Sequence, residues 1–444
     1  MKSRKSKVLH PVCGKPMLQI IVELAATAGL GPHIVVVSGK SEPVREALGS
    51  GCLYAVQEEQ LGTGHALIQS QDVVPDCDNL VVMAGDTPLL RPQTLVELTQ
   101  THLASEAPIT MLTSSLTDPD GLGRVVRDSD SRITAVVEHR EADPETLSIN
   151  EINASVYCFR TSWLWDNLPR LGYSATGEIF LTDLVEVAAT QGSEVASVTV
   201  EDGAEALGIN TRLDLSRAES MMRDRIRRHW MMEGVTIPDP ESVYIDHDAH
   251  IGIDSVVLPN THIRGGTIIG EDCEIGPNSV VVDSQIADQC RIVSSVVEQA
   301  VIESDVQVGP FSHLRPGAYL ESEVRIGNFS EIKNSRIGRA TKSGHFSYIG
   351  DAEVGANVNI GAGSITCNYD GEKKNRTVIG DDVFIGCDTM MVAPVTIGDR
   401  SYTGAGSVIN KDVPPDSGAI GAPARIRSRK TGNDSGSPGR NAAR

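Results

Sequence analysis

The chain has few aromatic residues, no excess of basic charge and no long apolar run. Aromatic side chains make up 4% of its 444 residues, which favours a fold that packs small β-branched side chains in regular layers. The formal net charge of −20 argues against a general nucleic-acid binder, because such a protein needs a basic face. No apolar run of about 18 residues occurs, so the sequence predicts no membrane-spanning helix.

The sequence also lacks a Cys-x-x-Cys pair. Its eight cysteines are scattered along the chain, which favours free thiols in a reducing cytosol over disulfides or a zinc site. The basic opening segment is followed by an amphipathic pattern that contains Glu23, and not by the apolar core of a signal peptide. We therefore expect a cytoplasmic protein.

The first half of the chain, residues 1–212, alternates short β-branched runs with helical patterns. Such alternation predicts a Rossmann-like α/β domain with a mostly parallel sheet, in which ligands bind beyond the carboxyl ends of the strands. The pattern indicates strands at 33–39, 54–57, 79–86 and 108–115, and a helix at 91–105.

After this domain comes one long helical pattern over 211–234, which ends at Gly234. We interpret 213–233 as a linker helix, because glycine commonly follows the last helical residue. The final residues, 431–444, are polar and rich in glycine and serine, and we expect them to form a disordered tail.

Between linker and tail, residues 234–430 repeat an aliphatic residue followed by glycine, many of the gaps being six residues or a multiple of six. This period predicts a parallel β-helix, in which each aliphatic residue stacks on its equivalent in the next coil. A polar stretch at 366–377 breaks the repeat and should leave the β-helix as a loop. The repeat includes Ile269-Gly270, Ile326-Gly327, Ile349-Gly350, Ile360-Gly361 and Ile385-Gly386.

Several motifs of the first half suggest a nucleotide site. A buried strand ends at Asp86, where one carboxylate would suit Mg²⁺, although Asp86 could instead cap the next helix. The Gly62-Thr63-Gly64 turn could bring its backbone amides close to a base or phosphate. Lys2, Arg4, Lys5 and Lys7 precede a helical run, which suits an anion.

The order of the motifs resembles one enzyme family throughout. The segments KVLHPVCGKPM, QLGTGHA, AGDTPLL, GLGRVV, VVEHREA, EIN, GEIFLTDL and GIN precede FSHLRPGA, GNFSEIKN, GHFSYIGDAEVGANVNIGAGSITCNYDG and IGCDTMMVAPV. Together they resemble the bacterial bifunctional N-acetylglucosamine-1-phosphate uridylyltransferase / glucosamine-1-phosphate N-acetyltransferase family. The resemblance implies a pyrophosphorylase domain, a linking helix and a left-handed parallel β-helix in a cytoplasmic homotrimer. It also implies two reactions that make UDP-N-acetylglucosamine for peptidoglycan and lipopolysaccharide, with acetyl-CoA and UTP as co-substrates and Mg²⁺ as cofactor.

For uridylyl transfer, the resemblance assigns the nucleotide phosphates to Lys7 and Mg²⁺ to Asp86 and Asn210. The remaining residues of this site are expected to contact the nucleotide or the sugar. The uracil is expected to contact Gln57, Gly62 and Thr63. The sugar is expected to contact Gly123, Glu138 and Asn153. Ala84, Gly85 and Asp86 are expected to line the same site.

For acetyl transfer, the resemblance makes His345 the general base, a role that suits an imidazole because it titrates near neutral pH. The sugar phosphate should meet Arg315 and Lys333, and the sugar Tyr348 and Asn359. The residues expected at acetyl-CoA are Ala362, Asn368, Tyr369, Cys387 and Ala405.

The chain departs from the family pattern at three places. Cys387 replaces a common serine, and Ala422 replaces an arginine whose place Arg425, Arg427 or Arg429 could take. The family's first strand and glycine-rich loop have no counterpart here. Either the recorded sequence starts too late, at an internal methionine, or this chain has lost uridylyl transfer. In the second case the chain would be an acetyltransferase with a vestigial first domain. A third hypothesis makes the β-helix a passive assembly module, which would not need His345.

Overall fold

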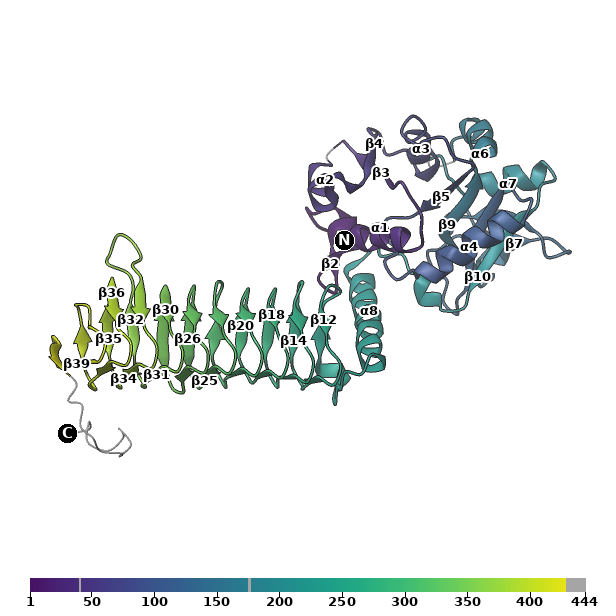
Figure 1. Ribbon diagram of the computed structural model, residues 1–444. Coiled ribbons are helices and arrows are strands. Elements are labelled where there is room, and N and C mark those ends of the chain that lie inside the picture. Colours follow the sequence, from purple (N-terminus) through teal and green to yellow (C-terminus); the bar gives the residue numbers. More distant parts are fainter. Residues whose placement is uncertain (40, 175–176, 429–444) are drawn as a thin grey trace. The chain divides into compact units, whose positions relative to one another are not determined.

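The computed structural model describes residues 1–39, 41–174 and 177–428 (Figure 1). The chain divides into two compact units, Met1–Met222 and Arg223–Arg444, and the division falls inside the helix α8 (Arg212–Met232). The expected tail at 431–444 lies outside the described residues. None of the helices in the described ranges combines the length and hydrophobicity that a membrane crossing requires.

Helix α8 begins with a reciprocal cap. The Thr211 hydroxyl accepts from the backbone N–H of Asp214 (3.1 Å), and the Asp214 carboxylate accepts from the backbone N–H of Thr211 (2.8 Å). This exchange satisfies amide groups that have no partner within the first turn. Beyond the helix, Gly234 adopts a φ of +92°, a conformation that glycine reaches without steric cost.

The first unit is built on a six-stranded mixed sheet, in the order β10-β6-β9-β7-β8, with β5 also paired to β9. The long strand β9 runs antiparallel to its neighbours, so the sheet is less parallel than the sequence predicts. Strands β7 and β8 form the hairpin that leads back into β9, and such a short connection requires antiparallel pairing. The strands are β5 (Asn79–Met83), β6 (Ile109–Ser115), β7 (Arg124–Arg127), β8 (Ile133–Val137), β9 (Glu151–Arg160) and β10 (Val195–Val200).

Helices surround this sheet. Helix α4 packs on β6, β9 and β10, while α7 packs on β8 and β10, and the buried side chains between these layers form the core. The helices of the unit are α1 (Met17–Thr27), α2 (Glu42–Leu48), α3 (Thr63–Ile68), α4 (Pro92–Ala104), α5 (Pro144–Leu147), α6 (Thr161–Asn167) and α7 (Asp183–Thr190).

Two strands of the first unit stand apart from the main sheet. Strands β3 (Ile34–Ser38) and β4 (Leu53–Gln57) pair in parallel with each other. Among the described residues, β3 pairs only with β4, and β5 only with β9. A cavity of about 470 Å³ is lined by both β3 and β5, and by apolar side chains of α1. A small antiparallel pair, β1 (Pro11–Val12) and β2 (Lys15–Pro16), precedes α1.

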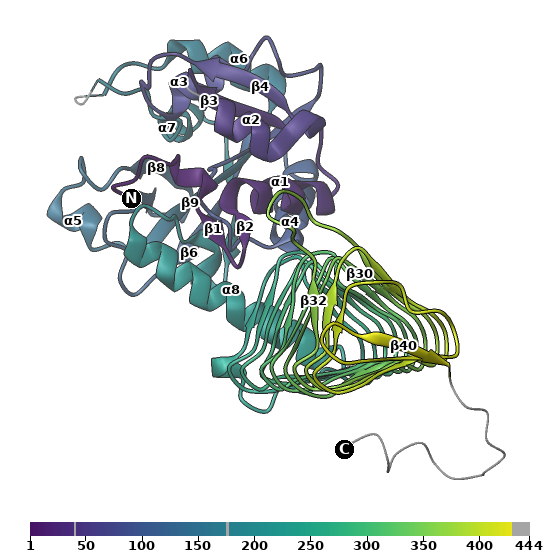
Figure 2. The same ribbon diagram turned by 90° about the vertical axis from the view of Figure 1, so that its left-hand side faces the viewer.

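The second unit is a parallel β-helix of triangular cross-section, as Figure 2 shows along its axis. This arrangement is consistent with the expected left-handed hexapeptide fold. Its described strands form three faces, which we name by their strand counts of ten, nine and eleven. The ten-stranded face holds β11 (Tyr244–Ile245), β14 (His262–Arg264), β17 (Val280–Val282), β20 (Val296–Glu298), β23 (His313–Leu314), β26 (Ser330–Lys333), β29 (Ser347–Gly350), β32 (Ile365–Cys367), β35 (Met390–Val392) and β38 (Val408–Ile409).

The other two faces complete each coil. The nine-stranded face holds β12 (His250–Ile251), β15 (Ile268–Ile269), β18 (Gln285–Ile286), β21 (Val301–Ile302), β24 (Tyr319–Leu320), β27 (Arg336–Ile337), β30 (Ala352–Val354), β33 (Thr377–Ile379) and β36 (Val395–Ile397). The eleven-stranded face holds β13 (Val256–Val257), β16 (Glu274–Ile275), β19 (Arg291–Ile292), β22 (Gln307–Val308), β25 (Arg325–Ile326), β28 (Lys342–Ser343), β31 (Asn359–Ile360), β34 (Phe384–Ile385), β37 (Tyr402–Thr403), β39 (Ser417–Ile420) and β40 (Arg425–Ser428).

The predicted aliphatic residues fill the β-helix interior in vertical columns. On the ten-stranded face Leu314 pairs in register with Ile332, and Ile332 with Ile349, and all three are fully buried. Each such side chain contributes about 1.5–3 kcal/mol by leaving water. The glycine after each aliphatic residue admits the next coil, since a Cβ at Gly327 would lie 2.1 Å from the Gly344 carbonyl oxygen.

The expected loop leaves the β-helix between β32 and β33 and projects from it (Figure 1). It is a hairpin whose base is closed by the Asn375 N–H donating to the Asn368 carbonyl (2.7 Å). Its tip is held by Asp370, whose carboxylate accepts from the backbone N–H groups of Glu372 (2.9 Å) and Lys373 (2.8 Å). These hydrogen bonds hold the pKa of Asp370 down at about 2, so the loop keeps this order across physiological pH.

Candidate active sites

Three polar side chains of the first unit meet at one point. The Lys7 ammonium donates to the Asp86 carboxylate (Nζ–Oδ2 2.5 Å) and to the Asn210 amide oxygen (Nζ–Oδ1 2.9 Å). The backbone N–H of Ile209 donates to the Asp86 carbonyl (3.0 Å), which holds the two segments side by side. Helix α4 starts at Pro92 with Arg91 at its cap, so the alternative role of Asp86 as a helix cap is wrong.

The Gly62-Thr63-Gly64 turn is fastened to a distant segment. A Cβ on Gly62 would lie 2.5 Å from the carbonyl oxygen of Ile179, and its φ is +99°, so this position requires glycine. The same carbonyl accepts the N–H of Gly64 (2.9 Å), and the Thr63 hydroxyl accepts the N–H of Leu181 (3.0 Å). The turn is therefore held rigidly where α3 begins.

A half-buried carboxyl group marks the predicted sugar site. The Thr182 hydroxyl donates to Glu138 (Oγ1–Oε1 3.2 Å), and burial raises the pKa of Glu138. The Gly123 carbonyl accepts from the N–H of Asn153 (3.0 Å), whose side-chain amide donates to the Tyr157 hydroxyl (2.6 Å). The structure thus brings these predicted residues to the open end of the β7–β8 hairpin, with hydrogen-bonding groups that suit a sugar.

Five predicted residues line the cavity described above, namely Thr63, Ala84, Gly85, Glu138 and Asn153. The remaining six do not line it. Each of them is adjacent in sequence to a lining residue, or is hydrogen-bonded to a lining residue or to another of the six, and they are Lys7, Gln57, Gly62, Asp86, Gly123 and Asn210. The cavity therefore joins the predicted uracil and sugar regions to the space between β3 and β5.

On the ten-stranded face of the second unit, the predicted phosphate and sugar residues lie on neighbouring strands. Glu331 and Lys333 both point outward from β26, because side chains alternate along a strand. Tyr348 on β29 is in register with Glu331. Arg315, which directly follows β23, donates to the Glu331 carboxylate (Nη1–Oε1 2.7 Å). One outward surface therefore carries both predicted cations and the tyrosine.

The loop adds a cation that sequence reasoning missed. Lys374 lies within side-chain hydrogen-bonding range of Lys333, and this contact together with the Lys374 charge lowers the pKa of Lys333, with Arg315 adding to the effect. Three cations that repel one another at one surface favour a multiply charged anion between them. The signal in the sequence was the Lys373-Lys374 pair within the polar loop, but the sequence does not show which lysine turns inward.

The loop also carries two predicted coenzyme residues. The Asn368 side-chain amide donates to the Tyr348 hydroxyl (3.3 Å) and to the Asp351 carboxylate (2.5 Å). A Cβ at Gly350 would lie 2.3 Å from the Tyr348 hydroxyl oxygen, so this glycine makes room for the tyrosine ring. Tyr369 is exposed and donates to the Gly371 carbonyl (2.6 Å).

The edge between the eleven- and ten-stranded faces carries the other coenzyme residues in one column. The Asp388 N–H donates to the Ala362 carbonyl (2.7 Å), and the Gly406 N–H to the Cys387 carbonyl (2.8 Å). Ala362, Cys387 and Ala405 therefore occupy equivalent corners of successive coils. The next corner along the same edge holds His345. The Gly363 N–H donates to the carbonyl of Phe346 (2.8 Å), the residue that directly follows His345.

The His345 side chain is exposed, and no group in the described part of the chain hydrogen-bonds to its ring. Its backbone carbonyl accepts from the Ser330 hydroxyl (2.7 Å), which anchors the corner. The imidazole is thus presented to solvent between the cationic surface and the coenzyme column, so both of its nitrogens are open to a substrate.

Asn359 stands apart from the other sugar residues. It lies on β31, in register with Lys342 and Phe384, and therefore on the eleven-stranded face. Tyr348 lies on the ten-stranded face. Within one chain, these two predicted sugar residues lie on different faces of the β-helix.

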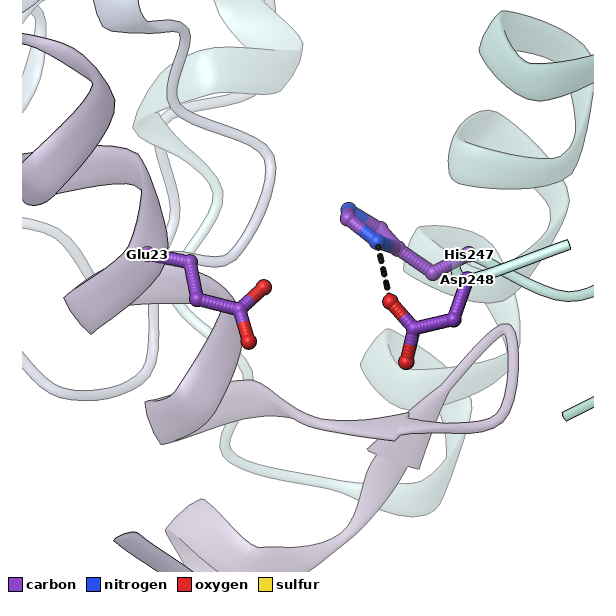
Figure 3. Close-up of side chains that lie close together, drawn as sticks. All are labelled: Glu23, His247 and Asp248. Carbon is purple, nitrogen blue, oxygen red and sulfur yellow. Dashed lines mark ion pairs between the residues drawn. The ribbon is translucent and has the colours of Figure 1, made fainter. Parts of the chain in front are cut away.

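A further group of acidic and imidazole side chains is drawn in Figure 3. His247 pairs with its neighbour Asp248 in the second unit (Nδ1–Oδ1 3.6 Å). Glu23 belongs to α1 of the first unit, where it accepts from Lys15 (2.5 Å). Each is engaged within its own unit, and neither takes part in the two candidate sites.

Comparison with known proteins matches both units. The family of nucleotidyl transferases matches residues 2–225, and the bacterial transferase hexapeptide family matches residues 248–283 and 376–411. The chain is 45% identical to "Bifunctional protein GlmU" of Acetivibrio thermocellus, over 97% of this chain and 93% of that protein. It is 46% identical to the protein of the same name from Thermoanaerobacter pseudethanolicus, over 98% of this chain and 94% of that protein.

Proposed function

The chain belongs to the family of bifunctional GlmU proteins, and we propose how its two sites divide the work of that family. It is an acetyltransferase and a uridylyltransferase. Acetyl transfer from acetyl-CoA to glucosamine-1-phosphate gives N-acetylglucosamine-1-phosphate, and uridylyl transfer from UTP then gives UDP-N-acetylglucosamine and pyrophosphate for cell-wall synthesis. The relatives match over both units, which disfavours an acetyltransferase with a vestigial first unit.

Acetyl transfer is assigned to the edge that carries His345. The substrate amine attacks the thioester carbonyl carbon, His345 accepts the amine proton, and the coenzyme thiolate leaves. The observation that carries this assignment is the position of an exposed imidazole one coil before Ala362, Cys387 and Ala405. At this corner His345 can accept a proton from a sugar amine held on the ten-stranded face, while the acetyl-CoA thioester lies toward Ala362, Cys387 and Ala405.

The sugar phosphate is assigned to Arg315, Lys333 and Lys374. Two ammonium groups and a guanidinium surround the outward surface of β26, and a phosphate dianion relieves their mutual repulsion. Tyr348 and Asn368, already hydrogen-bonded to each other, close the side of this surface. The phosphate holds the sugar so that its amine lies near His345, which reduces the entropy cost of the reaction.

Uridylyl transfer is assigned to the cavity of the first unit. Lys7, Asp86 and Asn210 converge at its edge, and the side-chain oxygens of Asp86 and Asn210 face one cation position. Oxygen donors of this kind fit Mg²⁺. When bound, the ion would neutralise charge on the phosphates. Lys7 pairs with the α-phosphate region of UTP, while Glu138 and Asn153 orient the acceptor sugar whose phosphate oxygen attacks the α-phosphorus.

The active oligomer is proposed to be a cytoplasmic homotrimer in which two chains complete each acetyltransferase site. Asn359 and Tyr348 lie on different faces, so a second copy is needed to bring both to one sugar. Along the same edge as His345, Phe311 and Phe329 are 61% and 62% exposed and stack at 5.5 Å. An exposed apolar ridge of this kind marks an interaction surface.

Mixing two inactive variants tests the shared site. Lys333→Ala removes a cation from the ten-stranded face, and Asn359→Ala removes the amide from the eleven-stranded face. If the faces of two chains form each site, co-expressed subunits should regain acetyl transfer, because some sites receive both native residues. No recovery in verified mixed oligomers would place both residues in the site of a single chain.

A further inference from the structure

The amide of Gln57 is held by two acceptors. Its nitrogen donates to the Gly62 carbonyl (Nε2–O 3.2 Å) and lies 3.0 Å from Nδ1 of His65. Gln57 ends β4, and His65 lies in the first turn of α3. The two side chains therefore meet across the turn that contains Gly62 and Thr63.

The carbonyl of Gly62 determines the direction of this network. A carbonyl oxygen only accepts, so the end of the Gln57 amide that faces it is the nitrogen. The second hydrogen of that nitrogen is then directed at Nδ1 of His65, which must be the unprotonated nitrogen of the ring. The ring hydrogen then stands on Nε2, which lies 3.3 Å from Nε2 of Gln69. Rotation of the Gln69 amide about its terminal bond exchanges its two ends and turns its oxygen to this hydrogen.

As a result, Gln57 offers only an acceptor to a ligand. Both of its amide hydrogens are engaged, and nothing in the described part of the chain donates to its Oε1. A uracil ring donates a hydrogen at N3, whereas the N3 of cytosine is an acceptor. An acceptor facing an acceptor leaves two polar groups unpaired, which costs more than the loss of one neutral hydrogen bond.

We propose that His65 is a positioning residue that makes the first site specific for uracil over cytosine. By accepting from Gln57, it adds a second hydrogen bond to that of the Gly62 carbonyl and so keeps the amide oxygen directed outward. Without His65 only the 3.2 Å bond to Gly62 opposes the rotation that presents the amide hydrogens to cytosine. This inference rests on the proposed function, in which Gln57 contacts the base of the nucleotide.

The test compares His65→Ala with His65→Asn in the full chain. Asparagine places its Oδ1 near the position of Nδ1 and so restores the acceptor, whereas alanine removes it. Binding of UTP and CTP is measured by titration calorimetry, and kcat and KM for both nucleotides in the uridylyl assay. His65→Ala should weaken UTP about 10-fold and lower the UTP/CTP preference by about the same factor, with kcat little changed. His65→Asn should recover most of that preference.

The melting transition of the first unit, recorded by calorimetry on the same samples, shows whether each variant is folded around His65, and acetyl transfer reports only that the β-helix is intact. An unchanged UTP/CTP preference in His65→Ala, in a protein where Gln57→Ala lowers it, would overturn the role of His65. If Gln57→Ala leaves UTP binding unchanged, the assignment of Gln57 to the base is wrong, and the proposal falls with it. Equal loss in the alanine and asparagine variants would show that His65 only supports the fold.

Discussion

The two units position their functional side chains in different ways. In the β-helix, residues reach the site by stacking, as Glu331 and Tyr348 do in register on neighbouring strands. In the first unit, residues arrive from separate loops and are held by individual contacts, such as Gly62 against Ile179 and Asp86 against Ile209. A repeated backbone ladder thus supports one site, and single tertiary contacts support the other.

This difference predicts how each site responds to change. A substitution on the surface of the β-helix leaves the inner columns and backbone pairing intact, so it should alter chemistry without altering assembly. A substitution at a contact such as Gly62 in the first unit should change both stability and binding, because the same atoms serve both.

The largest expected effect tests the chemistry of the β-helix. His345→Ala should lower kcat of acetyl transfer by about 10²–10⁴-fold, because a positioned general base contributes that much. Uridylyl transfer and oligomer size should not change, as measured by a coupled pyrophosphate assay and by light scattering.

His313→Ala is the matched control, since it removes an imidazole that is already paired with Glu298 (2.9 Å) on the same face. Wild-type acetyl transfer in His345→Ala would exclude this residue as the base. Loss of the oligomer in the same variant would show that the surface and the fold of the β-helix are not independent.

The loop provides a second test of the β-helix site. Lys374→Ala should raise KM for glucosamine-1-phosphate by about 10–10²-fold, because it removes a charge-assisted contact to phosphate. Lys373→Ala removes the same charge from the neighbouring residue, whose backbone N–H binds Asp370, and should have a small effect. Similar KM values for both variants would mean that general loop charge, and not Lys374, attracts the substrate.

A third test concerns the contacts of the first unit. Gly62→Ala should lower the melting temperature of that unit by several degrees, since strain and clash of this kind cost about 1–3 kcal/mol. The transition of the β-helix in the same calorimetric scan should stay in place. Gly29→Ala is the control, because Gly29 also has a positive φ (+77°) but no atom lies within 4 Å of its added Cβ. Equal shifts for the two variants would mean that the contact with Ile179 contributes nothing.

The smallest expected effect depends on pH. Burial raises the pKa of Glu138, so the folded state keeps this proton to higher pH than the unfolded state does. The resulting stability is fully present below the unfolded pKa and is lost as pH rises through the folded pKa. Glu138→Gln should therefore melt higher than the wild type at neutral pH, with the difference shrinking as pH falls toward 4.

A melting difference independent of pH would show that Glu138 does not titrate between these states. The pH dependence should not vanish entirely in the variant, because burial also raises the pKa of Asp183. The β-helix transition in the same scans reports any effect that does not come from the first unit.

Prediction from the sequence worked best where local pattern and tertiary structure coincide. The six-residue repeat predicted the β-helix and the loop at 366–377, because each coil repeats the environment of the last. Motif order assigned Arg315, Lys333 and Tyr348 to one site, and the structure brings these three residues to one surface. The antiparallel direction of β9 was missed, since a strand's residues are compatible with either direction of pairing.

The sequence by itself determined the periodic architecture of the second unit and the identity of the chemical groups in both. Only the tertiary structure decided that Lys7 meets Asp86 and Asn210, that Lys374 and not Lys373 faces Lys333, and that Asn359 lies on another face from Tyr348. The physical reason is that local pattern controls which way a side chain points from its own strand. The distant side chain that it then contacts depends on how the loops fold back and how the coils align. The spacing of residues close in sequence does not determine these long-range contacts.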